Sequence, residues 1–395
     1  MAPVVEIERA DRAAPEASDV DAGVISDARV RQRRRRGLAA AGAIGAALAV
    51  SVVVLGGVLG GGVSAPGTTG VRGGLPTGAL EPLKVAGPLA VSPRGTLYIA
   101  DVASDRILVR LRSGGFRVVA GDGKVGFSGD GGQALHAELS GVSELAFSPA
   151  GGLYVVDGGR VRVIDPDGVI RTVAGNGRPA ATIANGTPAL SAPLGRSRPV
   201  ASGGSPPSIA FSTDGTLYLS TASQQLLRLT AAGTLETVRA VVLSGPLAGE
   251  FDRNIGPIAI DDRGDIDVAG YNGWSIWRVA TNGVAHQIGF GAAGQARRSG
   301  GNYSLLQRAP DGSVYAENGP TLLRIQANRL EVTFAFTQPM RREFFWMTYF
   351  AFGPRGTLYA DEIPGGGGFE AHQQLVSVRG PRVALLWQEN IRTPK

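Results

Sequence analysis

The sequence contains no cysteine, and histidine and methionine occur only three times each among 395 residues. Without cysteine there is no disulfide framework, no thiolate nucleophile and no cysteine-ligated metal. Charged residues make up only 18%, and a net charge of +6 spread over so long a chain argues against a nucleic-acid partner. Glycine and proline, in contrast, are abundant, with 59 and 24 residues that fall in turns throughout the chain. This composition is typical of an all-β repeat protein.

One long stretch, residues 37–63, carries no charge, and it directly follows the arginine-rich segment Arg31–Arg36. At 1.5 Å per residue it is long enough to cross a hydrocarbon core of about 30 Å. No Lys or Arg follows until Arg72, so the positive-inside rule places the N-terminus in the cytoplasm and the rest of the chain outside. The pattern therefore predicts a signal-anchor: a single-pass protein of the cytoplasmic (inner) membrane, with its main domain extracytoplasmic.

The domain boundaries follow from this reading. Residues 1–36 form a disordered cytoplasmic tail, 37–63 a transmembrane helix and 64–79 a linker rich in Gly, Pro and Thr. The alternative is a signal peptide cleaved near Ala65, although the long N-terminal region and the long apolar run favour the anchor.

Residues 88–123 contain a unit to which the rest of the chain returns. Four short runs rich in β-branched and aromatic residues are separated by three tight turns that contain glycine. Runs this short predict strands rather than helices, and tight turns between neighbours predict an antiparallel meander. In this first copy the expected strands are 89–91, 96–100, 107–111 and 116–120.

The unit occurs six times in all, and its clearest marker is the first turn with the second strand, as in PRGTLYIAD, TDGTLYLS and PRGTLYADE. One four-stranded sheet cannot bury both faces, but a ring of sheets can, because each packs on the next. The sequence thus predicts an all-β, six-bladed β-propeller over residues 80–395. The expected blades are 88–123, 141–177, 206–243, 256–291, 302–337 and 344–390.

The repeats LYIADVASDRILVRLRSGGFRVVAG and LYVVDGGRVRVIDPDGVIRTVAG, and the linker GFSGDGGQA at 126–134, resemble NHL repeats, in the form typical of bacterial members. The resemblance is strongest over 85–195. The resemblance implies a β-propeller, and many propellers of this family bind a partner without catalysing a reaction. Some propellers of this kind are lyases that hold a metal on the axis with histidines from several blades. Blades four and five depart from the pattern, since Ile266-Asp267 replaces Leu-Tyr in blade four and no Asp follows Tyr315 at the usual distance in blade five.

Closure of the ring has two readings. Leu80–Gly87, LEPLKVAG, resembles a detached fourth strand that would pair with the last blade. That blade, however, has a fourth strand of its own in Arg382–Trp387. Either the closing blade carries an extra strand, or the strands in this blade are assigned one position out of register.

Asp101, Asp157 and Asp361 end the second strands of blades one, two and six. Each is expected to cap its own turn by accepting backbone N–H groups. The alternative is a ring of acids near the mouth of the channel that binds a cation or a cationic ligand. Asp130, with Asp122, is a candidate calcium ligand, although the EF-hand pattern is absent.

His136 and His372 lie in expected loops on the face where the interblade linkers emerge, and are the candidate zinc ligands. Binding is expected on that face, because loops on a rigid scaffold usually carry it. Its insertions are 121–141, 175–207, 244–256, 290–302 and 361–374.

The favoured function is an extracytoplasmic binding or sensor module for a protein, peptide or cell-wall glycan. The alternative is a metal-dependent propeller enzyme of lyase or lactonase type, which requires three His, Asp or Glu side chains to converge near the axis. A structural part in an envelope complex is a third option. We assign no catalytic residue and predict no cofactor, with calcium or zinc as the alternative.

Overall fold

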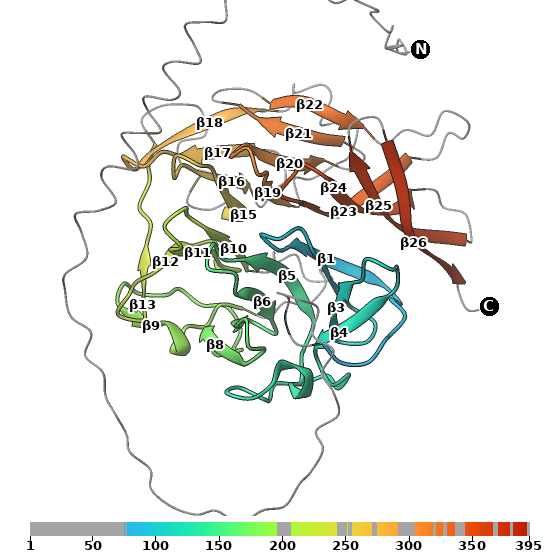
Figure 1. Cartoon of the computed structure of the whole chain (residues 1–395). Helices are drawn as coiled ribbons and strands as arrows, with labels where there is room; N and C mark the ends of the chain where they lie inside the picture. The colour runs from blue at the N-terminus through green and yellow to red at the C-terminus, as the bar shows by residue number, and fades with distance from the viewer. Residues whose placement is uncertain are drawn as a thin grey trace, which may run out of the picture. The chain divides into compact units, whose positions relative to one another are not determined.

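The computed structural model describes residues 75, 77–195, 207–242, 251, 255–270, 275–290, 305–318, 321–326, 330–335, 344–365, 370–379 and 382–392. All belong to one compact unit, residues 66–395. They form six antiparallel sheets set as blades around an axis, so the predicted all-β, six-bladed propeller is confirmed (Figure 1). The predicted membrane span, 37–63, lies outside these residues. Within them, no helix is long and apolar enough to cross a membrane.

Each blade consists of four strands that are consecutive in the chain, and their bounds agree with the expected repeats. Blade one is β1 Ala86–Val91, β2 Leu97–Asp101, β3 Arg106–Arg110 and β4 Phe116–Ala120. Blade two is β5 Val142–Phe147, β6 Leu153–Asp157, β7 Arg160–Ile164 and β8 Ile170–Ala174. Blade three is β10 Ser208–Phe211, β11 Leu217–Ser220, β12 Leu226–Leu229 and β13 Thr234–Thr237.

The second half of the ring repeats this order. Blade four is β15 Ile255–Ile260, β16 Ile266–Gly270, β17 Ser275–Val279 and β18 Val284–Phe290. Blade five is β19 Leu306–Arg308, β20 Val314–Asn318, β21 Thr321–Ile325 and β22 Leu330–Ala335. Blade six is β23 Phe344–Phe352, β24 Leu358–Gly365, β25 Glu370–Arg379 and β26 Arg382–Arg392.

The first turn of each blade shows why the repeat carries glycine at this point. In blade one, Gly95 adopts a φ of 85° and its N–H donates to Ser92 O at 2.8 Å, which closes a tight turn between β1 and β2. Only glycine adopts such a φ without steric cost. Glycines with positive φ occupy the same turn in the other blades, namely Gly151, Gly215, Gly264, Gly312 and Gly356.

The core lies between the blades. The inner strands β1, β5, β10, β15, β19 and β23 contact one another in that order, and β23 contacts β1, so the ring is closed. The tyrosine of the second strand packs edge-on against the first strand of the next blade. The ring centroids are 5.1 Å apart for Tyr98–Phe147 and 4.7 Å for Tyr154–Phe211. Such aromatic pairs add to the apolar burial that joins neighbouring blades.

The prediction that Leu80–Gly87 supplies a fourth strand to the last blade is wrong. Residues 78–81 instead run beside β4 of blade one: Gly78 N donates to Val118 O at 2.7 Å, and Leu80 bridges Arg117. The fourth strand of blade six is β26, as the alternative had it.

A buried glutamine joins the two ends of the ring. Gln373, on β25, accepts a hydrogen bond from Ala86 N at 3.0 Å and donates to Ala86 O at 2.7 Å and to Asp361 Oδ2 at 2.9 Å. These bonds connect blade six to the start of β1 across 287 residues of sequence. The ring therefore closes through packing of inner strands and one side-chain amide rather than through a shared blade.

The linkers cover the outer edges of the blades that follow them. Residues 131–134 pair with β8, β9 (Thr187–Pro188) pairs with β13, and β14 (Val241–Val242) pairs with β18. Residues 78–81 stand in the same relation to β4. An outer strand otherwise presents unpaired N–H and C=O groups, which invite edge-to-edge association. The linkers thus act as fifth strands.

Candidate functional site

Asp101 and Asp157 tie the incoming chain to the second strand of their blades. Asp101 Oδ1 accepts from Val85 N at 3.1 Å and, within its own turn, from Ala103 N at 3.2 Å. Asp157 Oδ1 accepts from Ser140 N at 2.5 Å. Both side chains are 1% exposed. They therefore bond the segment that precedes the first strand of each blade.

Asp130 and Asp157 are the two predicted site residues that the structure brings together, and Arg162 joins them. The Arg162 side chain is fully buried; its Nη1 lies 3.2 Å from Asp157 Oδ2, and its Nη2 lies 2.8 Å from Asp130 Oδ1. The guanidinium also donates to Glu138 O at 2.9 Å and to Ser128 O at 2.7 Å. Arg162 thus fastens the GFSGDGG linker to blade two.

The two carboxyl groups respond differently to this position. Burial raises the pKa of Asp157 against the opposing influence of Ser140 N and Arg162. At Asp130, burial also acts to raise the pKa, but hydrogen bonds from Thr172 and Arg162 outweigh it and hold the pKa below its usual value. The Asp130 oxygens, predicted as candidate calcium ligands, are therefore occupied by Arg162 and by the N–H group of Thr172.

The remaining predicted residues lie apart from this pair. Asp361 is fully buried in blade six and accepts from Gln373. His136 is exposed in the 3-10 helix η1, Ala134–His136, of the first linker. The prediction that His372 lies in a loop is wrong, since it is on β25 opposite Asn390; its side chain is outside the described part of the structure. Among the residues described, no three His, Asp or Glu side chains are placed to hold one metal ion.

The insertion-bearing face has an ordered surface around Arg160. The guanidinium carbon of Arg160 lies 3.7 Å from the centroid of the Phe127 ring, and its Nη2 donates to Asn176 O at 2.9 Å. Phe127 belongs to the first linker and Asn176 to the second, so Arg160 joins both. Phe127 remains 43% exposed, and nearby in the same linker Val125 is 72% exposed. An aromatic and an aliphatic side chain are thus displayed on a fixed backbone.

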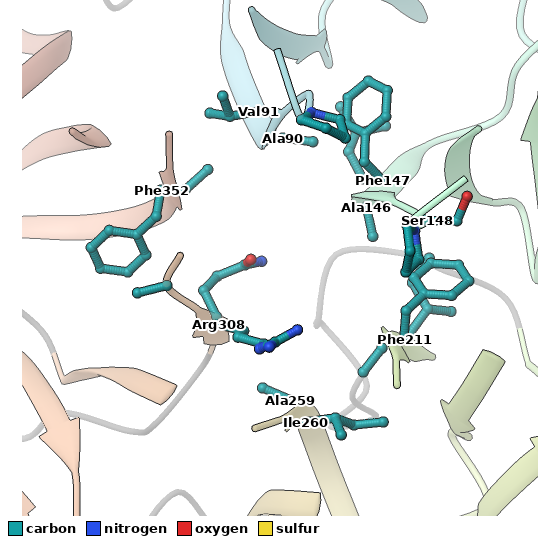
Figure 2. Close-up of a pocket in the computed structure, with 18 of the residues that line it drawn as sticks. Ala90, Val91, Ala146, Phe147, Ser148, Phe211, Ala259, Ile260, Arg308 and Phe352 are labelled. Atoms are coloured by element: carbon teal, nitrogen blue, oxygen red, sulfur yellow. The ribbon is translucent and has the colours of Figure 1, made fainter. Parts of the chain in front are cut away.

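A cavity of about 420 Å³ lies on the axis, at the end of the inner strands farther from the linkers (Figure 2). All six inner strands line it, and so do prolines of four first turns. Its wall is mainly alanine, valine, isoleucine and phenylalanine. Glu144 and Arg308 are the two titratable residues among those that line it.

Glu144 is a buried acid that the sequence pattern did not reveal. Its oxygens accept from Ile209 N at 3.0 Å and from Ser208 Oγ at 3.3 Å, which links β5 to β10. Ser208 Oγ in turn accepts from Ile258 N at 3.3 Å on β15. Burial raises the pKa of Glu144 to about 8, since the hydrogen bonds only partly offset desolvation. The carboxyl group is therefore protonated at neutral pH.

Arg308 was also missed, although a signal existed. Inner strands repeat an alanine followed by an apolar residue, and blade five alone replaces this pair with Gln307-Arg308. Aligning the first strands of the six repeats would have shown a charge at a position that is apolar in every other blade.

Six sheets in a closed ring define an all-β, six-bladed propeller. The sequence model of the teneurin NHL domain matches residues 111–191, from the end of blade one through blade two to η2 (Ala189–Ser191). The match confirms the resemblance of the repeats to the NHL family. No curated protein matches the chain.

Solved structures with a similar arrangement share little sequence with it. Virginiamycin B lyase from Staphylococcus aureus is 14% identical, with a TM-score of 0.42 over 78% of this chain and 85% of that one. A streptogramin B lyase is 12% identical, with a TM-score of 0.45 over 80% and 88%. The PQQ-bound aldose sugar dehydrogenase from Streptomyces coelicolor is 17% identical, with a TM-score of 0.41 over 72% and 90%. Likeness at this level carries no argument about ligand or reaction.

Proposed function

We propose that the protein is an extracytoplasmic binding or sensor module, held at the cytoplasmic membrane of a bacterial cell by one N-terminal span. Its partner is a protein, a peptide or a cell-wall glycan, recognised by the insertion-bearing face. The observation that supports this most directly is the surface around Arg160, where two linkers from different blades are joined and display Phe127 and Val125. An exposed aromatic group on a preorganised backbone loses little entropy on binding.

Rigidity of that surface follows from the buried contacts beneath it. Arg162 holds the first linker through two carbonyl oxygens and the Asp130 carboxylate. The second linker is held by Gly175 N, which donates to Ala189 O at 2.8 Å, and by pairing of β9 with β13. The two linkers that meet at Arg160 are therefore each bonded to the blades at several points.

Site-specific crosslinking in envelopes tests the binding role. A photoreactive amino acid at Val125 is expected to give a discrete crosslinked species in bacterial cells that express the full-length protein. The control is the same amino acid at Ser113, which is exposed in the third turn of blade one, at the opposite end of the strands. Equal crosslinking from both positions, or none from Val125, would contradict recognition by the insertion-bearing face.

The absence of cysteine makes the membrane topology easy to test. In intact cells, a membrane-impermeant maleimide is expected to label Ser113→Cys but not Ser18→Cys, which lies in the predicted cytoplasmic tail. Permeabilised cells should allow labelling of both. Labelling of Ser18→Cys in intact cells would reverse the topology. Recovery of the Ser113→Cys protein in the soluble fraction, shortened at its N-terminus, would favour the cleaved signal peptide.

The metal-dependent lyase or lactonase remains the alternative. It requires several ligands at one point, whereas the described wall of the axial cavity offers one carboxyl group, Glu144, with both oxygens bonded to blade three. Metal content of the purified protein, with thermal unfolding before and after a chelator, decides between the two. Stoichiometric metal with a lowered melting temperature after chelation would favour the enzyme.

A further inference from the structure

The wall of the axial cavity has one position at which a charge replaces an apolar residue. The last residue of each inner strand pairs with the first residue of the second strand, which aligns the six blades. The residues at this position are Val91, Phe147, Phe211, Ile260, Arg308 and Phe352. Blade five thus places a guanidinium where its five counterparts place hydrocarbon.

Arg308 extends into the open centre of the cavity, and Phe147, Phe211 and Phe352 stand around its margin (Figure 2). The Nε atom of Arg308 is buried and has no hydrogen-bond partner. The guanidinium forms no ion pair with any residue of the described structure. The side chain as a whole is partly exposed where it lines the cavity, and a positive charge in such a partly enclosed position attracts a counter-charge.

Asp267 is the acid that the repeat would pair with Arg308, because it stands where tyrosines of other blades pack against the next inner strand. Both of its oxygens are already taken: Oδ1 accepts from Arg278 Nε and Oδ2 from Arg278 Nη2, each at 2.8 Å. This bidentate pair leaves Arg308 without a carboxylate from blade four. Glu144 lies in the same wall but is protonated at neutral pH, because its pKa is about 8. The lining of the cavity therefore carries a net positive charge.

We propose that the axial cavity binds a small organic carboxylate with an aromatic or other apolar body, and that Arg308 receives the carboxylate. A planar guanidinium presents parallel N–H donors that match the two oxygens of a carboxylate. The hydrocarbon wall suits an apolar body, and a volume of about 420 Å³ lies within the range of small-molecule sites. The small alanine that precedes this position in five of the six inner strands leaves space in the cavity.

This site is separate from the proposed partner surface. It lies at the end of the channel lined by the first turns, whereas Val125 and Phe127 belong to a linker at the other end of the strands. The proposal goes beyond the binding of a macromolecule and does not depend on it. If crosslinking at Val125 fails, the proposal of a cavity ligand still stands. If no ligand binds in the cavity, the proposed partner surface is unaffected.

The probe is 1-naphthoate, with neutral 1-naphthamide as its matched analogue, titrated calorimetrically into the full-length protein in lipid nanodiscs. Empty nanodiscs provide the blank for partition into lipid. We expect saturable, one-to-one binding of 1-naphthoate and at least tenfold weaker binding of 1-naphthamide. Equal affinity for the two compounds, or no binding of 1-naphthoate above the blank, would overturn the proposal.

Three variants locate the site. Arg308→Gln keeps most of the side-chain length but removes the charge, and is expected to weaken 1-naphthoate binding by roughly ten- to a hundredfold, the value of one charge-assisted contact. Arg308→Lys retains the charge without the parallel N–H donors of the guanidinium. Its affinity for 1-naphthoate should lie between those of Arg308→Gln and the unaltered protein. Arg324→Gln removes the same charge from the same blade outside the cavity, where Arg324 pairs with Asp311, and should bind as the unaltered protein does.

Each result bears on the assignment. If Arg308→Gln binds 1-naphthoate as tightly as the unaltered protein, or if Arg324→Gln weakens binding as much, Arg308 is not the receptor. If Arg308→Gln fails to fold, the comparison of 1-naphthoate with 1-naphthamide and the Arg308→Lys variant still decide, because both use a folded protein with a charged side chain at this position.

Discussion

Replacing Glu144 by glutamine is expected to change how the stability of the propeller depends on pH. In the folded protein burial raises the pKa of Glu144 from 4.5 to about 8. The folded state therefore retains a proton that the unfolded chain has released. The stability that this proton confers is fully present below pH 4.5 and is lost as pH rises towards about 8.

The size of the effect follows from the width of that window. Each pH unit inside it costs about 1.4 kcal/mol of unfolding free energy, so raising the pH from 5 to 7 removes about 3 kcal/mol. Glutamine does not titrate. Its amide keeps an oxygen that accepts from Ile209 N, and its NH2 group takes the place of the oxygen that accepts from Ser208 Oγ. The stability of Glu144→Gln relative to the unaltered protein should therefore rise by about 3 kcal/mol between pH 5 and pH 7.

Thermal unfolding followed by tryptophan fluorescence at pH 5, 6, 7 and 8 measures this difference, because Trp277 is buried in the core. Asp157 and Asp267, whose pKa values burial also raises, are present in both proteins and largely cancel. Glu236→Gln, on β13 opposite Arg228 and with its side chain 42% exposed, is the control and should change stability only slightly at each pH, because an exposed ion pair contributes little. A constant difference for Glu144→Gln, or one that falls as pH rises, would refute the reasoning.

Three further changes test the framework of the ring by chemical or thermal unfolding. Gly175→Ala is expected to cost several kcal/mol, because a Cβ there would lie 2.5 Å from Gly159 O, whereas Gly215→Ala, with a similar positive φ but open space, should cost only about 1–2 kcal/mol. Equal losses would show that the clash relaxes. Arg162→Met should cost about 3–5 kcal/mol by leaving a buried carboxylate without its cation; a loss below 1 kcal/mol would contradict that role. Gln373→Ala should speed unfolding and lower stability by about 2–4 kcal/mol, since it removes three buried hydrogen bonds at the closure; unchanged unfolding kinetics would place ring closure elsewhere.

The blades and their number followed from the sequence because the information is local. Short runs with a period of two, bounded by glycine turns such as the one at Gly95, specify strands and hairpins within about ten residues. Six copies of the same pattern then require a ring, because one sheet cannot bury both of its faces. The role of Asp101 as a backbone acceptor within its own turn is local in the same sense, since Ala103 N is two residues away.

Only the tertiary structure showed which residues form the contacts between neighbouring blades. Closure depends on a hydrogen bond between Gln373 and Ala86, 287 residues apart, which no local pattern contains. Burial of Glu144 depends on β10 of the next blade, and desolvation is a property of surroundings rather than of sequence. An alignment of the six inner strands shows that Arg308 is a charge at an otherwise apolar position, but it does not show that this position faces a shared cavity. Only the closed ring places Arg308 and its five apolar counterparts around one cavity.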